Sequence, residues 1–253
     1  MEFDSEQHVM IQSDDGSYTA YSQQFQEHYH STRDGALHES LSKHVIPALK
    51  HCEDRDDISI LDICFGLGFN TLATLYYIQK EGIHKNVRIF SPEFDKELVA
   101  SLHCFTYPKE FTPFLAIVEA LSKHHVYKDE NLYIELYLGD ARVYVRHAKE
   151  KFDIVYQDAF SPSSNPLLWT VEYFKDIANL IKDDGIVTTY SMALKTRLAL
   201  HENGFKIYIH QGDGHRDSTL ASRQSLQHYK VVDMPHKIKC NPDVSPLRDA
   251  DIG

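Results

Sequence analysis

Residues 156–169, YQDAFSPSSNPLLW, place an acid, an aromatic ring and a proline directly after the apolar run FDIVYQ (152–157). Such a run is typical of a buried strand, and open α/β sheets bind ligands beyond the carboxyl ends of their strands. Asp158 could accept a hydrogen bond from an amine, and Phe160 could face the positive charge that develops on it. Pro162 would stiffen the turn. The segment therefore predicts a site for chemistry on an amine.

Asp158 is expected to orient the amine rather than to deprotonate it. An alkylamine has a pKa of about 10 and is mostly protonated at neutral pH, whereas a carboxylate with a pKa of about 4 is a poor base for it. A purely structural interpretation stays open, with Asp158 as a turn residue and Phe160 in the core. Trp169 is expected to pack at the start of the next helix, after a turn at Asn165 and Pro166.

The segment ILDICFGLGFNTLATL reads as a strand, a turn with Gly66 and Gly68, and a helix. Glycines there allow unusual backbone angles and let a ligand approach the main chain, although a loop that uses them only for packing is an equal alternative. A dinucleotide fingerprint would need glycine at Thr71, so a nucleoside is expected rather than a pyrophosphate. Asp62 could order the loop or face a positive ligand group, and Asn70 is expected beside the same ligand.

Two further acids follow the next predicted strands. Glu93 ends the second strand, where a carboxylate can accept hydrogen bonds from both ribose hydroxyls. Asp140 ends the third, where its carboxylate and the backbone NH of Ala141 could read an adenine edge, and it is also a candidate helix N-cap. Acids at the ends of three strands around a GxG turn predict a site for S-adenosylmethionine of the class I methyltransferase type.

The elements that must hold these residues alternate between strand and helix, which predicts a mostly parallel, Rossmann-like α/β sheet with helices on both faces. The expected strands span residues 58–64, 87–91, 132–138, 152–157, 185–191 and 205–210. The expected helices span residues 69–81, 95–104, 112–123, 140–149, 169–182 and 193–202. The signals Asp183 to Gly185 and Asn203 to Gly204 are expected to end the last two helices.

Three regions are expected along the chain. Residues 1–57 form an N-terminal extension packed on the core, with a hairpin turn near 14–21 and a helix near 36–50. Residues 58–233 form the methyltransferase domain. Residues 234–253 have three prolines and little apolar content, which predicts a tail that lies extended on the surface or is mobile.

The composition narrows the function classes. The chain has 253 residues and a net charge of -11, which excludes a uniformly basic nucleic-acid-binding surface but leaves a local basic patch open. The sixteen histidines and four cysteines lack metal-ligand spacing, so no metal site is expected. The sequence shows neither an apolar run of about 18 residues nor a signal peptide, which predicts a cytoplasmic protein without a membrane span.

Taken together, the motifs resemble those of the MnmC-type methyltransferases, which methylate the aminomethyl group of a modified wobble uridine in tRNA. The matching segments are YHSTRDGALHES (29–40), LDICFGLGFN (61–70), DAFSPSSNPLLW (158–169), TYSMALKTRLALHENGF (189–205) and GDGHR (212–216). The third segment is the most specific, because it carries the family pattern on Asp158, Phe160, Pro162, Asn165, Pro166 and Trp169.

The resemblance implies S-adenosylmethionine as the cofactor, also in contact with Asp158, and tRNA as the partner. Ser31 and Glu39 would bring the N-terminal extension to the cofactor pocket, and Pro162 and Tyr190 are expected on the substrate side. Candidates for a local basic face toward tRNA are Lys195, Arg197, Lys206, Arg216 and Arg223, for which solvated surface charge is an equal alternative.

The sequence also departs from the family pattern. Cys64 replaces the usual glycine of the first loop, and His215 with Arg216 replaces a Lys-Arg pair, which puts that tRNA contact in doubt. Some members carry a fused flavin-dependent oxidase. This chain shows no second nucleotide fingerprint, so a stand-alone methyltransferase is expected, supplied with amine-bearing tRNA by another enzyme.

Two other functions stay open on the sequence. An aminopropyl transferase of the polyamine synthase type would share the sheet, but its GGG loop and DxxDP-like acid pair are not found here. A non-catalytic adenosine- or RNA-binding module would retain the fold without the activity.

Overall fold

A nine-stranded mixed sheet forms the centre of the computed structural model, which describes residues 3, 5–212 and 216–252. The strand order in the described residues is β12-β10-β11-β9-β8-β4-β5-β7-β6. Its parallel part consists of β4 (Asp57–Ile63), β5 (Asn86–Glu93), β7 (Leu132–Leu138), β8 (Phe152–Gln157) and β9 (Ile181–Thr189). The pairs made by β6 (Val126–Lys128), β10 (Lys206–His210), β11 (Ser218–Ser222) and β12 (Lys230–Val231) are antiparallel.

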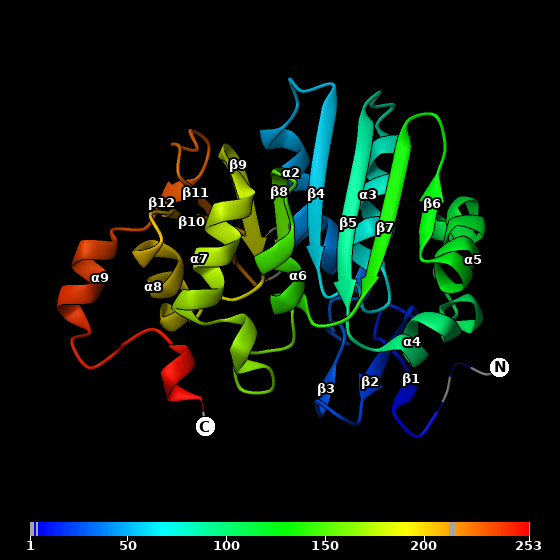
Figure 1. Ribbon diagram of the computed structural model, residues 1–253, viewed down its shortest axis with the longest axis horizontal. Coiled ribbons are helices and arrows are strands. Elements are labelled where there is room, and N and C mark those ends of the chain that lie inside the picture. Colours follow the sequence, from blue (N-terminus) through cyan, green and yellow to red (C-terminus); the bar gives the residue numbers. More distant parts are fainter. Residues whose placement is uncertain (1–2, 4, 213–215, 253) are drawn as a thin grey trace.

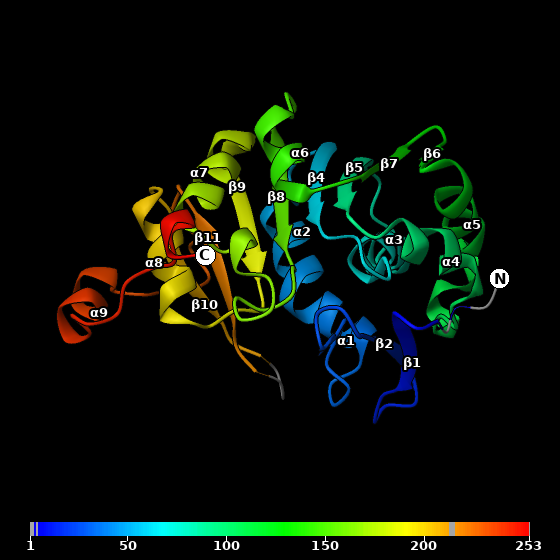
Figure 2. The same cartoon turned by 60° about the horizontal axis from the view of Figure 1, so that its bottom comes forward.

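Helices cover both faces of this sheet, as Figures 1 and 2 show. One face carries α1 (Ala36–Ser40), the π-helical turn η1 (Leu41–Val45), α2 (Ile46–His51) and α3 (Phe69–Lys80), with α4 (Lys96–Ser101) and α5 (Leu115–His124) toward the β6 edge. The other face carries α6 (Ala141–His147), α7 (Val171–Leu180) and α8 (Leu194–Glu202). The expected Rossmann-like α/β architecture is confirmed.

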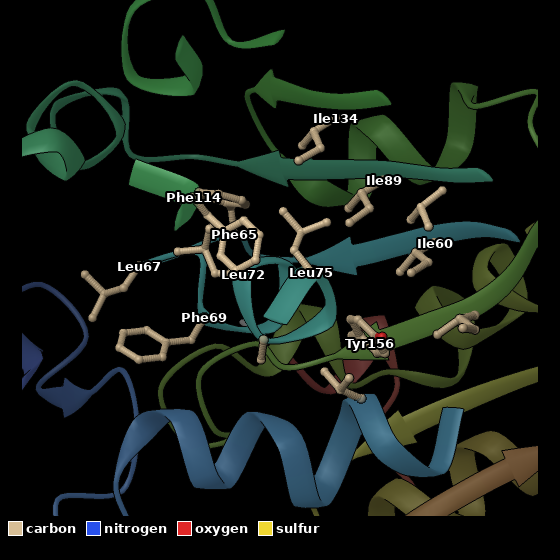
Figure 3. Close-up of a cluster of buried hydrophobic side chains, with 14 of the residues drawn as sticks. Ile60, Phe65, Leu67, Phe69, Leu72, Leu75, Ile89, Phe114, Ile134 and Tyr156 are labelled. Carbon is tan, nitrogen blue, oxygen red and sulfur yellow. The ribbon is translucent and has the colours of Figure 1, made fainter. Parts of the chain in front are cut away.

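The two faces bury separate hydrophobic clusters. On β4, Ile58 and Ile60 join the cluster under α3, while Leu61 and Ile63 join the cluster under α7. Figure 3 shows Leu72 and Leu75 of α3 beside Ile60 and Ile89 of the sheet, all in the first cluster. A parallel strand buried on both faces needs apolar residues at every position, which explains the continuous run in this strand.

The chain reverses direction across the sheet at β4. It runs from β4 outward through β5 to β7, and then returns to β8 on the other side of β4. Such a switch point opens a crevice beyond the carboxyl ends of the strands. A second sheet, made of β1 (His8–Gln12), β2 (Tyr18–Ser22) and β3 (Glu27–His28), lies below the arrowheads of β4 and β5 in Figure 1.

Most expected elements are present within a few residues, but the C-terminal half of the sheet differs. Helix α7 ends at Leu180 and β9 begins at Ile181, so the Asp183–Gly185 signal lies inside a strand. The sequence reading also missed β11, STLAS, which is buried between β9 and β10. Two of its three hydroxyls donate to main-chain carbonyls, Thr219 to Ser191 at 2.7 Å and Ser222 to Gly185 at 2.8 Å. A strand without apolar alternation can be buried when most of its polar groups are satisfied in this way.

The C-terminal residues correct the expectation of an extended tail. Residues Met234–Cys240 form α9, and the segment after it returns to α6 and α7. There Asp249 accepts two hydrogen bonds from the buried guanidinium of Arg142, and the Leu247 carbonyl accepts from the Val171 amide at 2.9 Å. The division into residues 1–57, 58–233 and 234–253 stays a prediction.

An ion cluster around the buried Asp153, at the N-terminal end of β8, gives a prediction for stability. The Asp153 carboxylate accepts from Lys182 at 2.8 Å, from the Ser59 amide at 2.8 Å and from Arg55. Burial raises the pKa of Asp153, but these three donors outweigh it, so the net pKa lies below its usual value. Asp153→Asn should lower the free energy of unfolding by about 3 kcal/mol at pH 7, because Lys182 loses its ion pair and Arg55 is left with its pair to Asp184.

The loss should depend on pH. A carboxylate whose pKa is depressed in the folded state stabilises fully above its unfolded pKa of about 4, and this contribution disappears as the pH falls further. Urea unfolding of wild type and variant should therefore converge toward pH 3. Asp183→Asn, which removes an exposed partner of Arg223, is the control and should change stability by less than about 1 kcal/mol. A difference for Asp153→Asn that is constant with pH would contradict this assignment.

Candidate functional site

A cavity of about 640 Å³ lies at the carboxyl edge of the sheet, at the switch point around β4. Its size is in the range of small-molecule sites. The N-terminal residues 24–32, the loops after β4, β5 and β7, and the segment after β8 form its walls. The residues expected from the sequence that line it are Ser31, Glu39, Gly66, Glu93, Asp140, Ala141, Asp158, Phe160, Asn165 and Tyr190.

The loop between β4 and α3 has three residues with positive φ: Cys64 at 64°, Gly66 at 54° and Gly68 at 77°. A Cβ on Gly66 would lie 3.1 Å from the Tyr29 ring, and a Cβ on Gly68 would lie 2.7 Å from the Phe65 ring. Gly66 therefore keeps the main chain open to the cavity, whereas Gly68 is needed for packing and for the start of α3. Cys64 takes the left-handed conformation without being glycine.

Glu93 joins this loop to the end of β5. Its Oε2 accepts from the Gly66 amide at 2.8 Å and its Oε1 from the Asp95 amide at 2.8 Å. The residue is 9% exposed, and burial raises the pKa of its carboxyl group. The carboxylate is thus held rigidly at the cavity wall by two backbone amides.

Asp140 both lines the cavity and caps a helix. Its carboxylate accepts from the amides of Arg142 at 2.6 Å and Val143 at 3.3 Å, so the N-cap prediction is confirmed. Ala141 follows as the first residue of α6 and lines the cavity beside it. The two residues lie beyond the end of β7, next to the end of β5.

Asp62 and Asn70 lie behind the cavity wall. Asn70 Nδ2 donates to Asp158 Oδ2 at 2.8 Å and approaches Asp62 Oδ1 at 3.4 Å, while Thr71 Oγ1 donates to Asp62 Oδ2 at 2.8 Å. Asp62 is 1% exposed, and burial raises its pKa to about 8. Of the two roles considered for Asp62, these contacts fit the ordering of the loop.

Asp158 lines the cavity just beyond β8, and its side chain is 14% exposed. Oδ2 is held by Asn70, and Oδ1 lies 3.4 Å from Nε2 of the buried His44. Burial raises the pKa of Asp158, but His44, His30 and Asn70 outweigh it and hold the pKa below its usual value. The side chain is therefore ionised at neutral pH and ready to accept a hydrogen bond.

Phe160 lies on the wall of the cavity rather than in the core. Its ring stacks on Phe25 with a centroid distance of 4.7 Å and is tilted against Tyr29 at 5.0 Å. Trp169 is 1% exposed and donates from Nε1 to the Phe160 carbonyl at 2.7 Å, which confirms its packing role. Tyr190 contacts the Trp169 ring and lines the same wall.

Contacts from the N-terminal extension fix the loop after β8. Glu27 of β3 accepts from the Ser161 amide at 2.9 Å and from the Ser161 hydroxyl. Glu39 accepts from the Ser31 amide at 2.7 Å and from Lys43 at 2.5 Å. Pro162 follows Ser161 on this loop.

Sequence reasoning missed four of the residues on this wall. Phe25, Glu27, Tyr29 and His30 all line the cavity. Tyr29 and His30 begin the YHSTRDGALHES segment, which could have identified them. Phe25 and Glu27 precede it without a recognisable signal.

The basic residues do not share one environment. Lys195 and Arg216 are exposed. Arg197 is buried and donates to Thr219 at 3.0 Å and to the Met192 sulfur at 2.8 Å, which corrects the expectation of a basic surface residue. Lys206 donates to Ser225, and Arg223 pairs with Asp183. His215 lies outside the described residues.

Two kinds of feature are absent from the described residues. No group of three or more His, Cys, Asp or Glu side chains there is placed to hold a metal ion. Over the same residues, no helix has the length and apolar character needed to cross a membrane.

The comparisons with known proteins agree with this geometry. Residues 109–225 match a family described as S-adenosyl-L-methionine-dependent methyltransferase. The crystal structure of MnmC2 from Aquifex aeolicus superimposes with a TM-score of 0.81 and 31% identity, covering 99% of this chain and 81% of that one. The chain belongs to the MnmC family of S-adenosylmethionine-dependent methyltransferases.

Two curated relatives extend the comparison. An uncharacterized protein of Methanocaldococcus jannaschii is 33% identical over 85% of this chain. The tRNA 5-methylaminomethyl-2-thiouridine biosynthesis bifunctional protein MnmC of Azoarcus sp. is 30% identical over 81% of it. This MnmC-type chain spans 60% of the first relative and 34% of the second.

Family membership makes S-adenosylmethionine the cofactor of this MnmC-type enzyme, and the residues fit it. Gly66 leaves open main chain where a Cβ would meet Tyr29, and carboxylates stand at the ends of β5 and β7 on one cavity wall. Membership also favours a methyltransferase over an aminopropyl transferase or a non-catalytic module.

Proposed function

We propose that this MnmC-type methyltransferase methylates the aminomethyl group of a modified wobble uridine in tRNA. The names of its relatives support the substrate, since the bifunctional MnmC proteins are named for 5-methylaminomethyl-2-thiouridine biosynthesis in tRNA. The observation that carries the proposal is that the carboxyl group of Asp158 and the aromatic ring of Phe160 line the same cavity. This arrangement suits an amine that becomes a cation.

The cofactor half of the cavity is assigned to the loops after β4, β5 and β7. Glu93 would accept from the ribose hydroxyls, Asp140 and the Ala141 amide would bind the adenine edge, and Gly66 would lie against the ligand without a side chain. When bound, S-adenosylmethionine supplies an electrophilic methyl group next to a sulfonium. Asp62 and Asn70 would act indirectly by holding the loop and the Asp158 carboxylate.

The acceptor half is assigned to the segment after β8. Asp158 would accept a hydrogen bond from the amine and hold its nitrogen in line for displacement, which is the main requirement of such a transfer. Phe160 would face the positive charge that develops on this nitrogen, and such a cation–π contact strengthens when water is excluded. Tyr190 and the loop at Pro162 would complete the substrate side.

Contact with tRNA needs cations on a chain whose net charge is -11. Lys195 and Arg216 are exposed and stay candidates, whereas the burial of Arg197 leaves it only an indirect role through α8 and β11. Binding of tRNA should weaken as the salt concentration is raised. The slope of the logarithm of the binding constant against the logarithm of the salt concentration should be small if few phosphates are contacted. A separate oxidative or amine-forming enzyme would supply the aminomethyl-uridine.

Labelled S-adenosylmethionine tests this function directly. The protein should transfer label to tRNA from cells that lack this methylation and accumulate the aminomethyl nucleoside, and nucleoside analysis should place the label at the wobble uridine. Fully modified tRNA is the control and should take up little label. Label at another nucleoside, or none in either tRNA, would reject the proposed substrate.

A further inference from the structure

His44 is a buried histidine next to the acceptor half of the cavity. It lies on the π-helical turn η1 between α1 and α2, and its side chain is 0% exposed. Its Nδ1 is 2.8 Å from Thr188 Oγ1 on β9, and its Nε2 is 3.4 Å from Asp158 Oδ1. Short π-helical segments inside helices are frequent at functional sites.

The Nε2 atom of His44 has no hydrogen-bond partner of ordinary geometry within the described residues. A buried polar atom left in this state costs about 1–3 kcal/mol, so its persistence calls for an explanation. Its charged neighbour is the carboxylate that faces the cavity. The imidazole of His44 therefore lies next to Asp158 through Nε2, and Thr188 contacts its other nitrogen, Nδ1.

Several other groups face this pair. Asn70 holds Asp158 Oδ2, and the Tyr156 ring packs edge-on to the imidazole at 5.8 Å. His30 lies on the cavity wall, and burial lowers its pKa although Asp158 and Glu39 oppose the shift. Lys43 is paired with Glu39, and Asp62 approaches Asn70 from the far side. These contacts surround the Asp158–His44 pair, of which Asp158 lines the cavity.

The amine of the proposed substrate must lose a proton before it can attack, so the site needs a proton acceptor. An alkylamine is mostly protonated at neutral pH, and only its neutral form has a lone pair for attack. A carboxylate alone is a poor base for an ammonium group, whereas an imidazole titrates much closer to neutral pH. Asp158 would contact the amine, and His44 behind it would be the better proton acceptor.

Resting on the proposed function, we propose that His44 is a positioning residue that acts through Asp158 as the acceptor of the substrate proton. The ammonium group gives one proton to Asp158 Oδ1, and the proton passes on to His44 Nε2. The N–H bond breaks, its electron pair stays on nitrogen as the attacking lone pair, and the protein holds a carboxylate beside an imidazolium. Charge and atoms balance without another reactant.

Two substitutions distinguish a proton-transfer role of His44 from a purely structural one. His44→Gln keeps an amide near the Nε2 position but cannot titrate, and we expect kcat at pH 7 to fall about tenfold or more while KM for tRNA changes little. The acidic limb of the kcat profile against pH should also disappear. His51→Gln, at the end of helix α2 that follows η1 and bonded to the Asp184 carbonyl, is the matched control and should behave as wild type.

A second measurement needs neither cofactor nor tRNA. Carboxyl ¹³C NMR of the cofactor-free protein should show the Asp158 titration moving to higher pH in His44→Gln, because the imidazolium no longer faces the carboxylate. If this variant does not fold, Thr188→Val, which removes the Nδ1 partner, replaces it and should displace the acidic limb.

The outcomes are distinguishable. If wild type methylates tRNA but the variant keeps the wild-type pH profile, or the Asp158 titration does not move, the role of His44 is overturned alone. If wild type transfers no methyl group to tRNA, the proposed function fails and the proton route fails with it.

Discussion

Asp158→Asn should lower the rate of methyl transfer by about 100-fold, the usual scale for losing a group that controls the protonation of a reacting atom. The substitution keeps the shape of the side chain and an oxygen for the Asn70 amide, which donates at 2.8 Å in the native protein. It removes the negative charge and the link to His44. The loss should therefore appear in kcat rather than in folding.

The measurement is single-turnover methyl transfer at saturating tRNA, together with calorimetric binding of S-adenosylhomocysteine. Cofactor affinity should change by no more than about threefold, since Asp158 is assigned mainly to the acceptor half. Asp183→Asn is the control for a surface aspartate. Unchanged turnover would remove Asp158 from the mechanism, and an equal loss in affinity and turnover would move it to the cofactor half.

Glu93→Gln should weaken binding of S-adenosylhomocysteine by about 30-fold, corresponding to about 2 kcal/mol for hydrogen bonds to a charged group. The native carboxylate also accepts from the Gly66 and Asp95 amides, so the glutamine NH₂ group would face a backbone donor or the ligand unfavourably. Calorimetry at pH 7.5 measures the change. Glu97→Gln, on the exposed side of α4, is the matched control and should bind as wild type.

The Glu93 effect has a pH signature. Burial raises the pKa of this carboxyl group, so it takes up a proton at higher pH than an exposed glutamate does. The wild-type affinity for S-adenosylhomocysteine should fall as the pH is lowered through this raised pKa, whereas Glu93→Gln should lack that component. A variant whose affinity follows the wild-type pH dependence would show that Glu93 does not hold the ligand in its ionised form.

Local sequence patterns determined much of the framework. The apolar runs of β4 and β8, the glycines of the first loop and the cap at Asp140 each depend on residues within a few positions of one another. Because parallel strands place their carboxyl ends at one edge, Glu93 and Asp158 could be assigned to one site from their positions alone. The resemblance to the MnmC family rested on the same local segments.

The tertiary structure decided which distant side chains complete the site. Glu27 meets Ser161 across 134 residues, and His44 meets Thr188 across 144, contacts that no local pattern encodes. Packing also decided that Arg197 is buried and that the polar strand β11 belongs in the sheet. In these places a polar group satisfied by a distant partner outweighs the local preference for the surface. The strand ends that line the cavity could therefore be predicted from the sequence, whereas the contacts of His44 and Arg197 could not.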